Sequence, residues 1–292
     1  MKNKKTETKV KSATGLARHS FGRVLCLGAV ILICASASAQ NLFVTGGDAG
    51  GGKIFKFTWD GVRSTFASGL SAPYGLTFDS TGNLFVAAGG GQILKFTPLG
   101  VQSTFASGLD FPIDLAFDST GNLFVADYGS GNIYKFTPDG VRTTFASLNL
   151  PEGLAFDVAG NLFVGEVGTG HIYEFTPGGV RTTFASGFVG ETNLTVDSAG
   201  NLFVSGSIGG NGVKVYKFTP GGARTLFASK MYAPASLDFD SAGNLFVVDL
   251  GLTEAPSAIY EFNRNGGHRR AFATGEPPDD PSLEFNYLAV QP

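Results

Sequence analysis

The chain repeats one pattern of about 40 residues six times. Its most regular unit is Asn-Leu-Phe-Val, whose copies begin at Asn41, Asn83, Asn122, Asn161, Asn201 and Asn244. A segment like Leu-Ala-Phe-Asp precedes this unit, and segments like Ile-Tyr-Lys-Phe and Thr-Phe-Ala-Ser follow it. Each segment is short, rich in β-branched or aromatic residues and bounded by Gly, Pro, Asn or Asp, which indicates strands joined by turns. Four strands in about 40 residues is the size of one β-propeller blade.

The two ends of the repeat region predict a closed ring. The first copy begins at Asn41 without its first strand, and residues 287–290 near the C-terminus resemble a first strand without a blade. Joining them leaves no unpaired sheet edge. We therefore predict an all-β, six-bladed β-propeller with four antiparallel strands per blade, closed by the C-terminal strand completing the N-terminal blade. The repeated Phe residues are expected in the core, and Trp59, which stands at a turn where four copies have Pro, is expected to pack locally.

The first 39 residues resemble a targeting segment. Seven Lys or Arg residues with one acid precede an apolar run at 24–34, and Ala37-Ser38-Ala39 is a small-residue cleavage site. We predict a signal peptide at 1–39, one domain at 40–292, and a secreted or periplasmic protein that uses the general secretory route and keeps no membrane span. Both cysteines leave with the signal peptide. The mature chain has 14 Lys and Arg against 23 Asp and Glu, a net charge of −9, which disfavours nucleic acid and anionic membranes as partners. A monomer is expected.

The repeat also resembles a known family. Residues 151–157 (PEGLAFD), 160–164 (GNLFV) and 172–175 (IYEF) look like the NHL repeat of six-bladed propellers, and more loosely like the gluconolactonase and senescence-marker-protein group. The resemblance covers residues 41–290. Such propellers include binding modules, lactonases and lyases, so the fold alone does not choose a function.

The resemblance to gluconolactonases implies a divalent cation at the mouth of the channel, held by Glu, Asn and Asp. Asp114, Glu152 and Asn193 on consecutive blades are the residues for this site, and their oxygen atoms suit calcium or magnesium. The family's ligand motif is not matched residue by residue. A solvated acidic rim is the alternative interpretation of the same residues.

The loops differ between the two ends of the predicted ring. At one end the turns keep nearly one length. At the other, the loops after the second strands are longest in blades five, six and one, and the loop between Thr274 and Leu288 is longer than its equivalents. Because binding sites are usually built on such loops, we predict binding residues on this variable face, at the channel mouth or after the second strands: Tyr74, Asp114, Asp127, Tyr128, Glu152, Glu166, His171, Asn193, Asp249, Glu254, Asp279, Asp280 and Tyr287. We also predict an acidic rim that favours a cationic or hydroxyl-rich partner, made of Asp48, Asp249, Glu254, Glu276, Asp279, Asp280 and Glu284.

Two functions are compatible with these features. The first is a non-catalytic binding module for a protein or glycan, which requires no cofactor. The alternative is a metal-dependent lactonase or lyase with calcium or magnesium at the channel mouth. A Ser-His-Asp hydrolase is unsupported, because no Gly-x-Ser-x-Gly motif occurs and the two histidines after residue 39 lie on different blades. The Gly-rich stretch at 47–53 lacks the Ser or Thr and the helix of a phosphate-binding loop.

Overall fold

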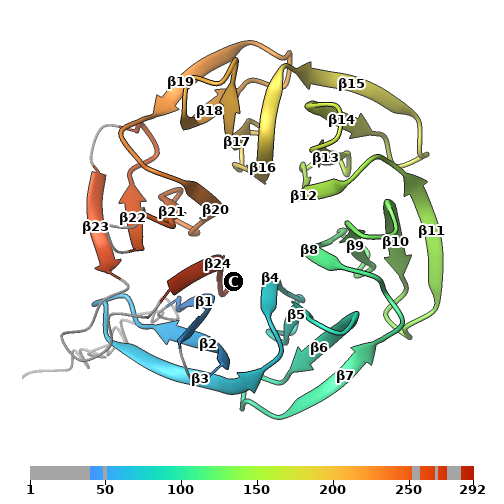
Figure 1. Cartoon of the computed structure of the whole chain (residues 1–292), viewed down its shortest axis with the longest axis vertical. Coiled ribbons are helices and arrows are strands. Elements are labelled where there is room, and N and C mark those ends of the chain that lie inside the picture. Colours follow the sequence, from blue (N-terminus) through green and yellow to red (C-terminus); the bar gives the residue numbers. More distant parts are fainter. Residues whose placement is uncertain (1–39, 49–50, 252–256, 267–268, 275–283) are drawn as a thin grey trace, which may run out of the picture. The chain divides into compact units, whose positions relative to one another are not determined.

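The computed structural model describes residues 40–48, 51–251, 257–266, 269–274 and 284–292 (Figure 1). These residues belong to a compact unit of residues 37–292. The predicted signal peptide lies outside the described residues, as do Glu254, Glu276, Asp279 and Asp280 of the predicted rim. Within the described part the regular elements are strands, and no helix there is long and apolar enough to cross a bilayer.

Six four-stranded antiparallel sheets are arranged around a central channel as the blades of a propeller (Figure 1), which confirms the predicted fold. The blades, each from its inner to its outer strand, are β24 (Glu284–Val290), β1 (Leu42–Asp48), β2 (Gly51–Phe57) and β3 (Arg63–Leu70); β4 (Pro73–Phe78), β5 (Leu84–Ala88), β6 (Gln92–Phe96) and β7 (Gln102–Ala106); β8 (Pro112–Phe117), β9 (Leu123–Asp127), β10 (Asn132–Phe136) and β11 (Arg142–Ser147); β12 (Pro151–Phe156), β13 (Leu162–Glu166), β14 (His171–Phe175) and β15 (Arg181–Ser186); β16 (Phe188–Val196), β17 (Leu202–Ile208), β18 (Val213–Phe218) and β19 (Arg224–Ala228); and β20 (Pro234–Phe239), β21 (Leu245–Asp249), β22 (Ala258–Phe262) and β23 (Arg269–Thr274).

The ring closes through strands from opposite ends of the chain, as predicted. β24 pairs antiparallel with β1, with Leu42 opposite Val290 and Val44 opposite Leu288. Phe285 is fully buried in the core of this blade. The C-terminal strand therefore supplies the inner edge of blade one.

In blades two to six, the turn between the first two strands is built from its own polar side chains. In blade three, Asp118 Oδ1 accepts hydrogen bonds from the backbone N–H groups of Thr120 and Asn122, each at 2.9 Å, and its Oδ2 accepts one from Asn122 Nδ2. Gly121 in this turn has a φ of 83°, a conformation that favours glycine. Because the Asp-x-x-Gly-Asn pattern recurs, the same turn is repeated around one end of the ring.

Phenylalanine rings join each blade to the next. Phe124 of β9 packs edge-on against Phe145 of its own blade and Phe156 of the following blade, with ring centroids 5.1 and 5.0 Å apart. The second strands of the blades are buried on both faces, and the repeated Phe residues lie in these interfaces. This confirms their predicted place in the core.

Trp59 packs differently from the sequence-based expectation. Its ring lies 5.2 Å from that of Phe246 and 6.1 Å from that of Phe272, both in the neighbouring sixth blade. The reason is that blade one lacks a phenylalanine side chain at this interface. Its inner strand ends in Val290, where most inner strands end in Phe. Trp59 fills this space across the interface at which the ring closes, so the expected local packing is wrong.

Candidate site at the central channel

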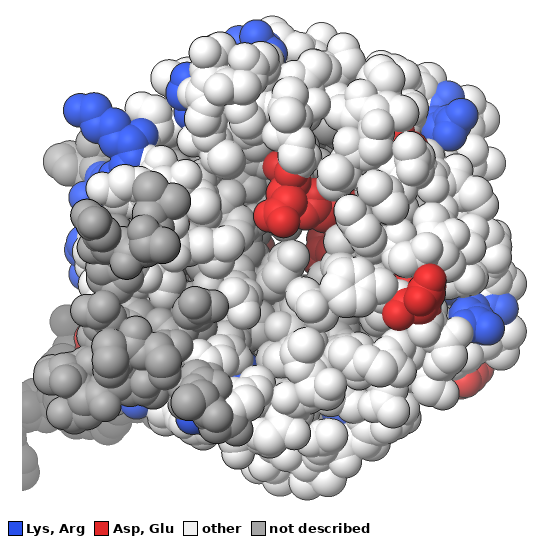
Figure 2. All heavy atoms as spheres, viewed as in Figure 1, with Lys and Arg blue, Asp and Glu red and all other residues white. Residues whose placement is uncertain are grey.

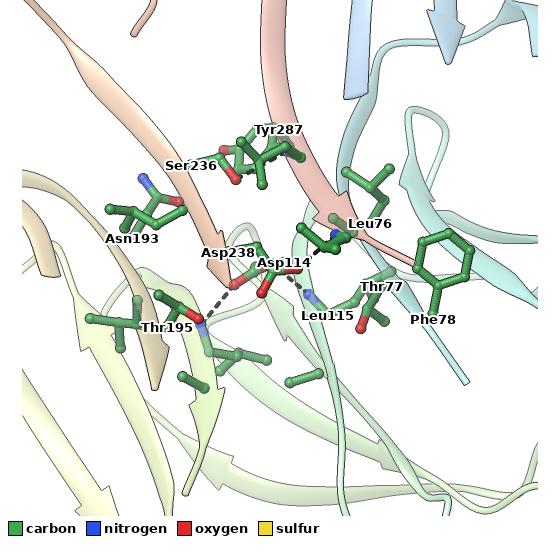
Figure 3. A pocket seen from close by; sticks show the side chains of 18 of the residues that line it. Leu76, Thr77, Phe78, Asp114, Leu115, Asn193, Thr195, Ser236, Asp238 and Tyr287 are labelled. Carbon is green, nitrogen blue, oxygen red and sulfur yellow. Dashed lines mark hydrogen bonds between the residues drawn. The ribbon is translucent and has the colours of Figure 1, made fainter. Parts of the chain in front are cut away.

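The inner strands β4, β8, β12, β16, β20 and β24 surround a cavity of about 310 Å³ (Figure 3). Its polar lining includes Asp114, Asn193, Ser236, Asp238 and Tyr287, which come from four of the six blades. These inner strands pair only with the second strand of their own blade. Their channel-facing backbone groups therefore need partners from outside the ladder.

Side chains from neighbouring blades supply those partners. Asp114 Oδ2 accepts a hydrogen bond from the N–H of Leu154 on the next blade at 2.7 Å, and its Oδ1 accepts one from the N–H of Leu115 at 2.8 Å. Asp238 has the same arrangement. Its Oδ2 accepts a hydrogen bond from the N–H of Val290 on the next blade, and its Oδ1 accepts one from the N–H of Phe239 on its own strand, both at 2.8 Å.

Glu152 forms a further cross-blade contact, nearer the start of the inner strands. Its Oε2 accepts a hydrogen bond from the N–H of Thr192 on β16 at 2.8 Å, and the side chain is only 4% exposed. A β-bulge between Pro151 and Leu154 interrupts the pairing of β12 at this point. The same shift occurs near the start of β4, β8 and β20, and Glu152 lies within it on β12. Sequence analysis expected these candidates at the channel mouth, and the structure places Asp114, Glu152 and Asn193 within the inner strands.

Acidic groups are close together at this end of the channel, where Figure 2 shows acidic atoms gathered in the central opening beside β12 and β16. Burial raises the pKa of Glu152 to about 7, and the charges of Glu191 and Asp114 add to this effect. Burial also raises the pKa of Asp114 to about 7, with a contribution from the charge of Asp238, and the pKa of Asp238 to about 6.

Four aromatic rings form a continuous row that begins at the channel. Tyr287 of β24 and Tyr74 of β4 have ring centroids 6.4 Å apart; Tyr74 lies 5.1 Å from Phe111, and Phe111 lies 6.1 Å from Tyr128. We refer to these residues as the aromatic row. Burial and the nearby charges of Glu152, Asp114 and Glu191 raise the pKa of Tyr287, which places the row beside the acidic groups.

Three predicted binding residues instead support loops. The carboxylates of Asp127, Glu166 and Asp249 are buried, and each accepts hydrogen bonds from backbone N–H groups of the loop before the inner strand of its own blade. For Asp127 the donors are Asp110 and Phe111. These carboxylates therefore hold the loops in place through hydrogen bonds within the fold.

His171 is separated from the channel. It begins β14, the third strand of its blade, where Nδ1 lies 2.7 Å from Thr169 Oγ1 and the ring lies beside Tyr173. Thr169 in turn hydrogen-bonds to Glu166. The structure therefore brings Tyr74, Asp114, Glu152, Asn193 and Tyr287 together around the channel, and places His171 elsewhere.

The expected cation ligands are partly engaged by hydrogen bonds within the fold. Both oxygens of Asp114 and one oxygen of Glu152 accept backbone hydrogen bonds, and Asn193 is a buried part of the cavity wall. Among the described residues there is no group of three or more His, Cys, Asp or Glu side chains that could hold a metal ion. The expected calcium or magnesium site, which includes the amide oxygen of Asn193, stays a prediction.

Sequence analysis missed three residues of this site. Phe111 continues the aromatic row, Glu191 adds a charge beside Glu152, and Asp238 adds a carboxyl group to the cavity. Asp238 had a detectable signal, because the other copies have Thr or Ala at its repeat position.

No family model and no curated protein sequence matches the chain. Solved structures do match its fold. A protein of unknown function from Bacteroides caccae has a TM-score of 0.64 at 14% identity, with 87% of this chain and 99% of that chain covered. A gluconolactonase from Xanthomonas campestris has a TM-score of 0.61 at 21% identity, with coverages of 68% and 76%. A catalytically inactive virginiamycin B lyase from Staphylococcus aureus with quinupristin has a TM-score of 0.60 at 17% identity, with coverages of 88% and 94%.

These similarities establish the fold. For the fold alone, they confirm the looser resemblance to the gluconolactonase group. The closer resemblance to NHL repeats stays a prediction.

Proposed function

We propose that this protein is an enzyme of the hydrolase or lyase class that acts on a cyclic ester at the central channel, with Glu152 as the proton-transferring residue. The observation that carries the proposal is the environment of Glu152: its carboxyl group is 4% exposed, accepts a hydrogen bond from Thr192 on the next blade, and is acted on by the charges of Glu191 and Asp114. The fold supports it, since similar solved structures include a gluconolactonase and a virginiamycin B lyase. This reverses the order of our two sequence-based hypotheses.

Glu152 and Asp114 supply both proton-transfer roles near neutral pH. With pKa values of about 7, Glu152 and Asp114 hold one ionised and one protonated carboxyl group at the pH where they are half-titrated. The ionised group takes a proton from water as the water oxygen bonds to the ester carbonyl carbon. The protonated group gives its proton to the ring oxygen as the C–O bond breaks.

The test is turnover of a panel of lactones by the wild-type protein and by Glu152→Gln. The amide oxygen of Gln still accepts the N–H of Thr192, so the fold is expected to persist while turnover falls by roughly 100-fold or more. Asp139→Asn, on an exposed turn at the other end of the ring, is the matched control. Full turnover in Glu152→Gln, or no turnover of any lactone by the wild-type protein, contradicts the proposal.

The second candidate is the non-catalytic binding module. It is favoured by the cross-blade hydrogen bonds of Asp114, which give that carboxylate a structural role without any substrate. Saturable binding of a protein or glycan without turnover supports this candidate. Metal analysis belongs to the same experiment, because one tightly held divalent cation per chain would revive the metal-dependent alternative.

The proposed activity belongs outside the cytoplasm. The basic start, the apolar run and Ala37-Ser38-Ala39 are the basis for expecting export and cleavage before Gln40. The intact mass of the exported protein tests this, since retention of residues 1–39 contradicts the signal peptide.

A further inference from the structure

The aromatic row continues outward from the channel. Tyr287 lines the central cavity, Tyr74 lies next to it on blade two, and Phe111 and Tyr128 belong to blade three. Phe111 is 39% exposed and the three tyrosines are half-buried, so the row reaches the surface at Phe111. Most aromatic contacts elsewhere belong to the buried interfaces between blades, so this row is a different kind of cluster.

The charge beside the row is negative. Ion pairs among the described residues include Lys95 with Asp79, Lys135 with Asp118, Lys217 with Asp197 and Arg270 with Glu261. None of them includes Glu152, Glu191 or Asp114. The charges that act on Glu152 are those of Glu191 and Asp114, both acidic. Tyr287, the channel end of the row, lines the cavity together with Asp114, and the charges of Glu152 and Glu191 also act on it.

We propose that the aromatic row binds a positively charged organic group of the ligand, such as a substituted ammonium, whose charge is balanced by Glu152 and Glu191. The faces of aromatic rings attract cations, and recognition of quaternary ammonium groups is a recurrent use of such rings. Charge complementarity selects this class, because an anionic ligand would be repelled by the same carboxylates. The inference rests on the proposed function in that it names a feature of the substrate at the same site.

The probe is choline, compared with 3,3-dimethylbutan-1-ol, which has the same shape without the charge. We expect choline to bind to the full chain at least about tenfold more tightly than the alcohol, as measured by calorimetry. Binding is expected to weaken as salt rises. Equal affinity for the two compounds, or no binding of either at millimolar concentration, would overturn the proposal.

Variants at Tyr74 locate the site. Tyr74→Leu removes the ring at the centre of the row and is expected to weaken choline binding about tenfold, whereas Tyr74→Phe keeps the ring and the affinity. Tyr232→Leu is the matched control, since Tyr232 is 57% exposed and lies outside the row. Melting temperatures show whether each variant is folded; if Tyr74→Leu does not fold, Phe111→Leu replaces it. Unchanged affinity in a folded variant of the row contradicts the proposal.

The outcome is separable from that of the proposed function. Choline binding without lactone turnover supports the aromatic row and rejects the enzyme. Turnover of neutral lactones without choline binding supports the enzyme and rejects the aromatic row as a cation-binding site.

Discussion

Asp114 Oδ2 accepts a hydrogen bond from the backbone N–H of Leu154, 2.7 Å away on the next blade. The inner strands do not pair with one another, so contacts of this kind are how their channel-facing N–H groups are satisfied. Glu152 with Thr192, and Ser236 with Leu288, make equivalent contacts between other pairs of blades. The polar lining of the channel therefore holds adjacent blades together.

We predict that Asp114→Ala destabilises the protein by about 1 to 3 kcal/mol, because the N–H groups of Leu154 and Leu115 lose their acceptor. Asp114→Asn is expected to cost less, since one oxygen remains. Urea unfolding measures both. Asp139→Ala, at the exposed turn, is expected to change little, and an Asp114→Ala variant as stable as this control would argue against the structural role.

The raised carboxyl pKa values predict that stability falls as pH rises from about 5 to 8. The folded-state pKa values of Asp114, Glu152 and Asp238 are about 7, 7 and 6, against ordinary values of 3.8, 4.5 and 3.8. At a pH between the ordinary and the folded-state pKa values, the folded protein keeps protons on these carboxyl groups that the unfolded chain has released. The stabilisation is therefore complete below the ordinary pKa values and is lost as pH rises through the folded-state pKa values. The melting temperature is expected to decrease across this range, and a melting temperature that rises would contradict it.

Glu152→Gln provides the internal check on this pH dependence. It removes one titrating group while it keeps an acceptor for Thr192, so the decrease in melting temperature is expected to be shallower than in the wild type. A slope unchanged by this substitution would mean that Glu152 does not have its raised pKa.

The aspartates of the turns give stability the opposite pH dependence. Hydrogen bonds lower the pKa of Asp79 and Asp118, so the stability that these residues contribute is lost as pH falls below about 4.

The repeat made most of the fold predictable. Strand positions, turns and ring closure follow from comparing six copies of one segment, because each copy has to fill the same space. The site was less predictable, because its features lie where single copies deviate. The contact of Glu152 with Thr192 and the loop N–H groups that hydrogen-bond to Asp127 depend on tertiary structure that no spacing reveals. Trp59 was misjudged for the same reason, since its partner Phe246 lies on another blade.

We predict that Trp59→Ala destabilises the protein by roughly 1 to 3 kcal/mol, less than for a fully buried Trp because this side chain is only half-buried. The loss comes from the gap left between Phe246 and Phe272. Thermal unfolding measures it, with Leu99→Ala as the control, because Leu99 is 92% exposed. Equal melting temperatures for the two variants would show that Trp59 is dispensable for closing the ring.

Removal of residues 284–292 is expected to abolish cooperative unfolding. β24 is the inner strand of blade one, and without it β1 is left with an open edge. Phe285, Leu288 and Val290 are buried, and at about 1.5 to 3 kcal/mol each their loss is comparable with the whole stability of many domains. A synthetic peptide of residues 284–292 is expected to restore the melting transition when it is added to the truncated chain, because it can pair with β1. A scrambled peptide of the same composition is the control. An intact melting transition in the truncated chain alone would mean that the ring does not depend on closure by its C-terminal strand.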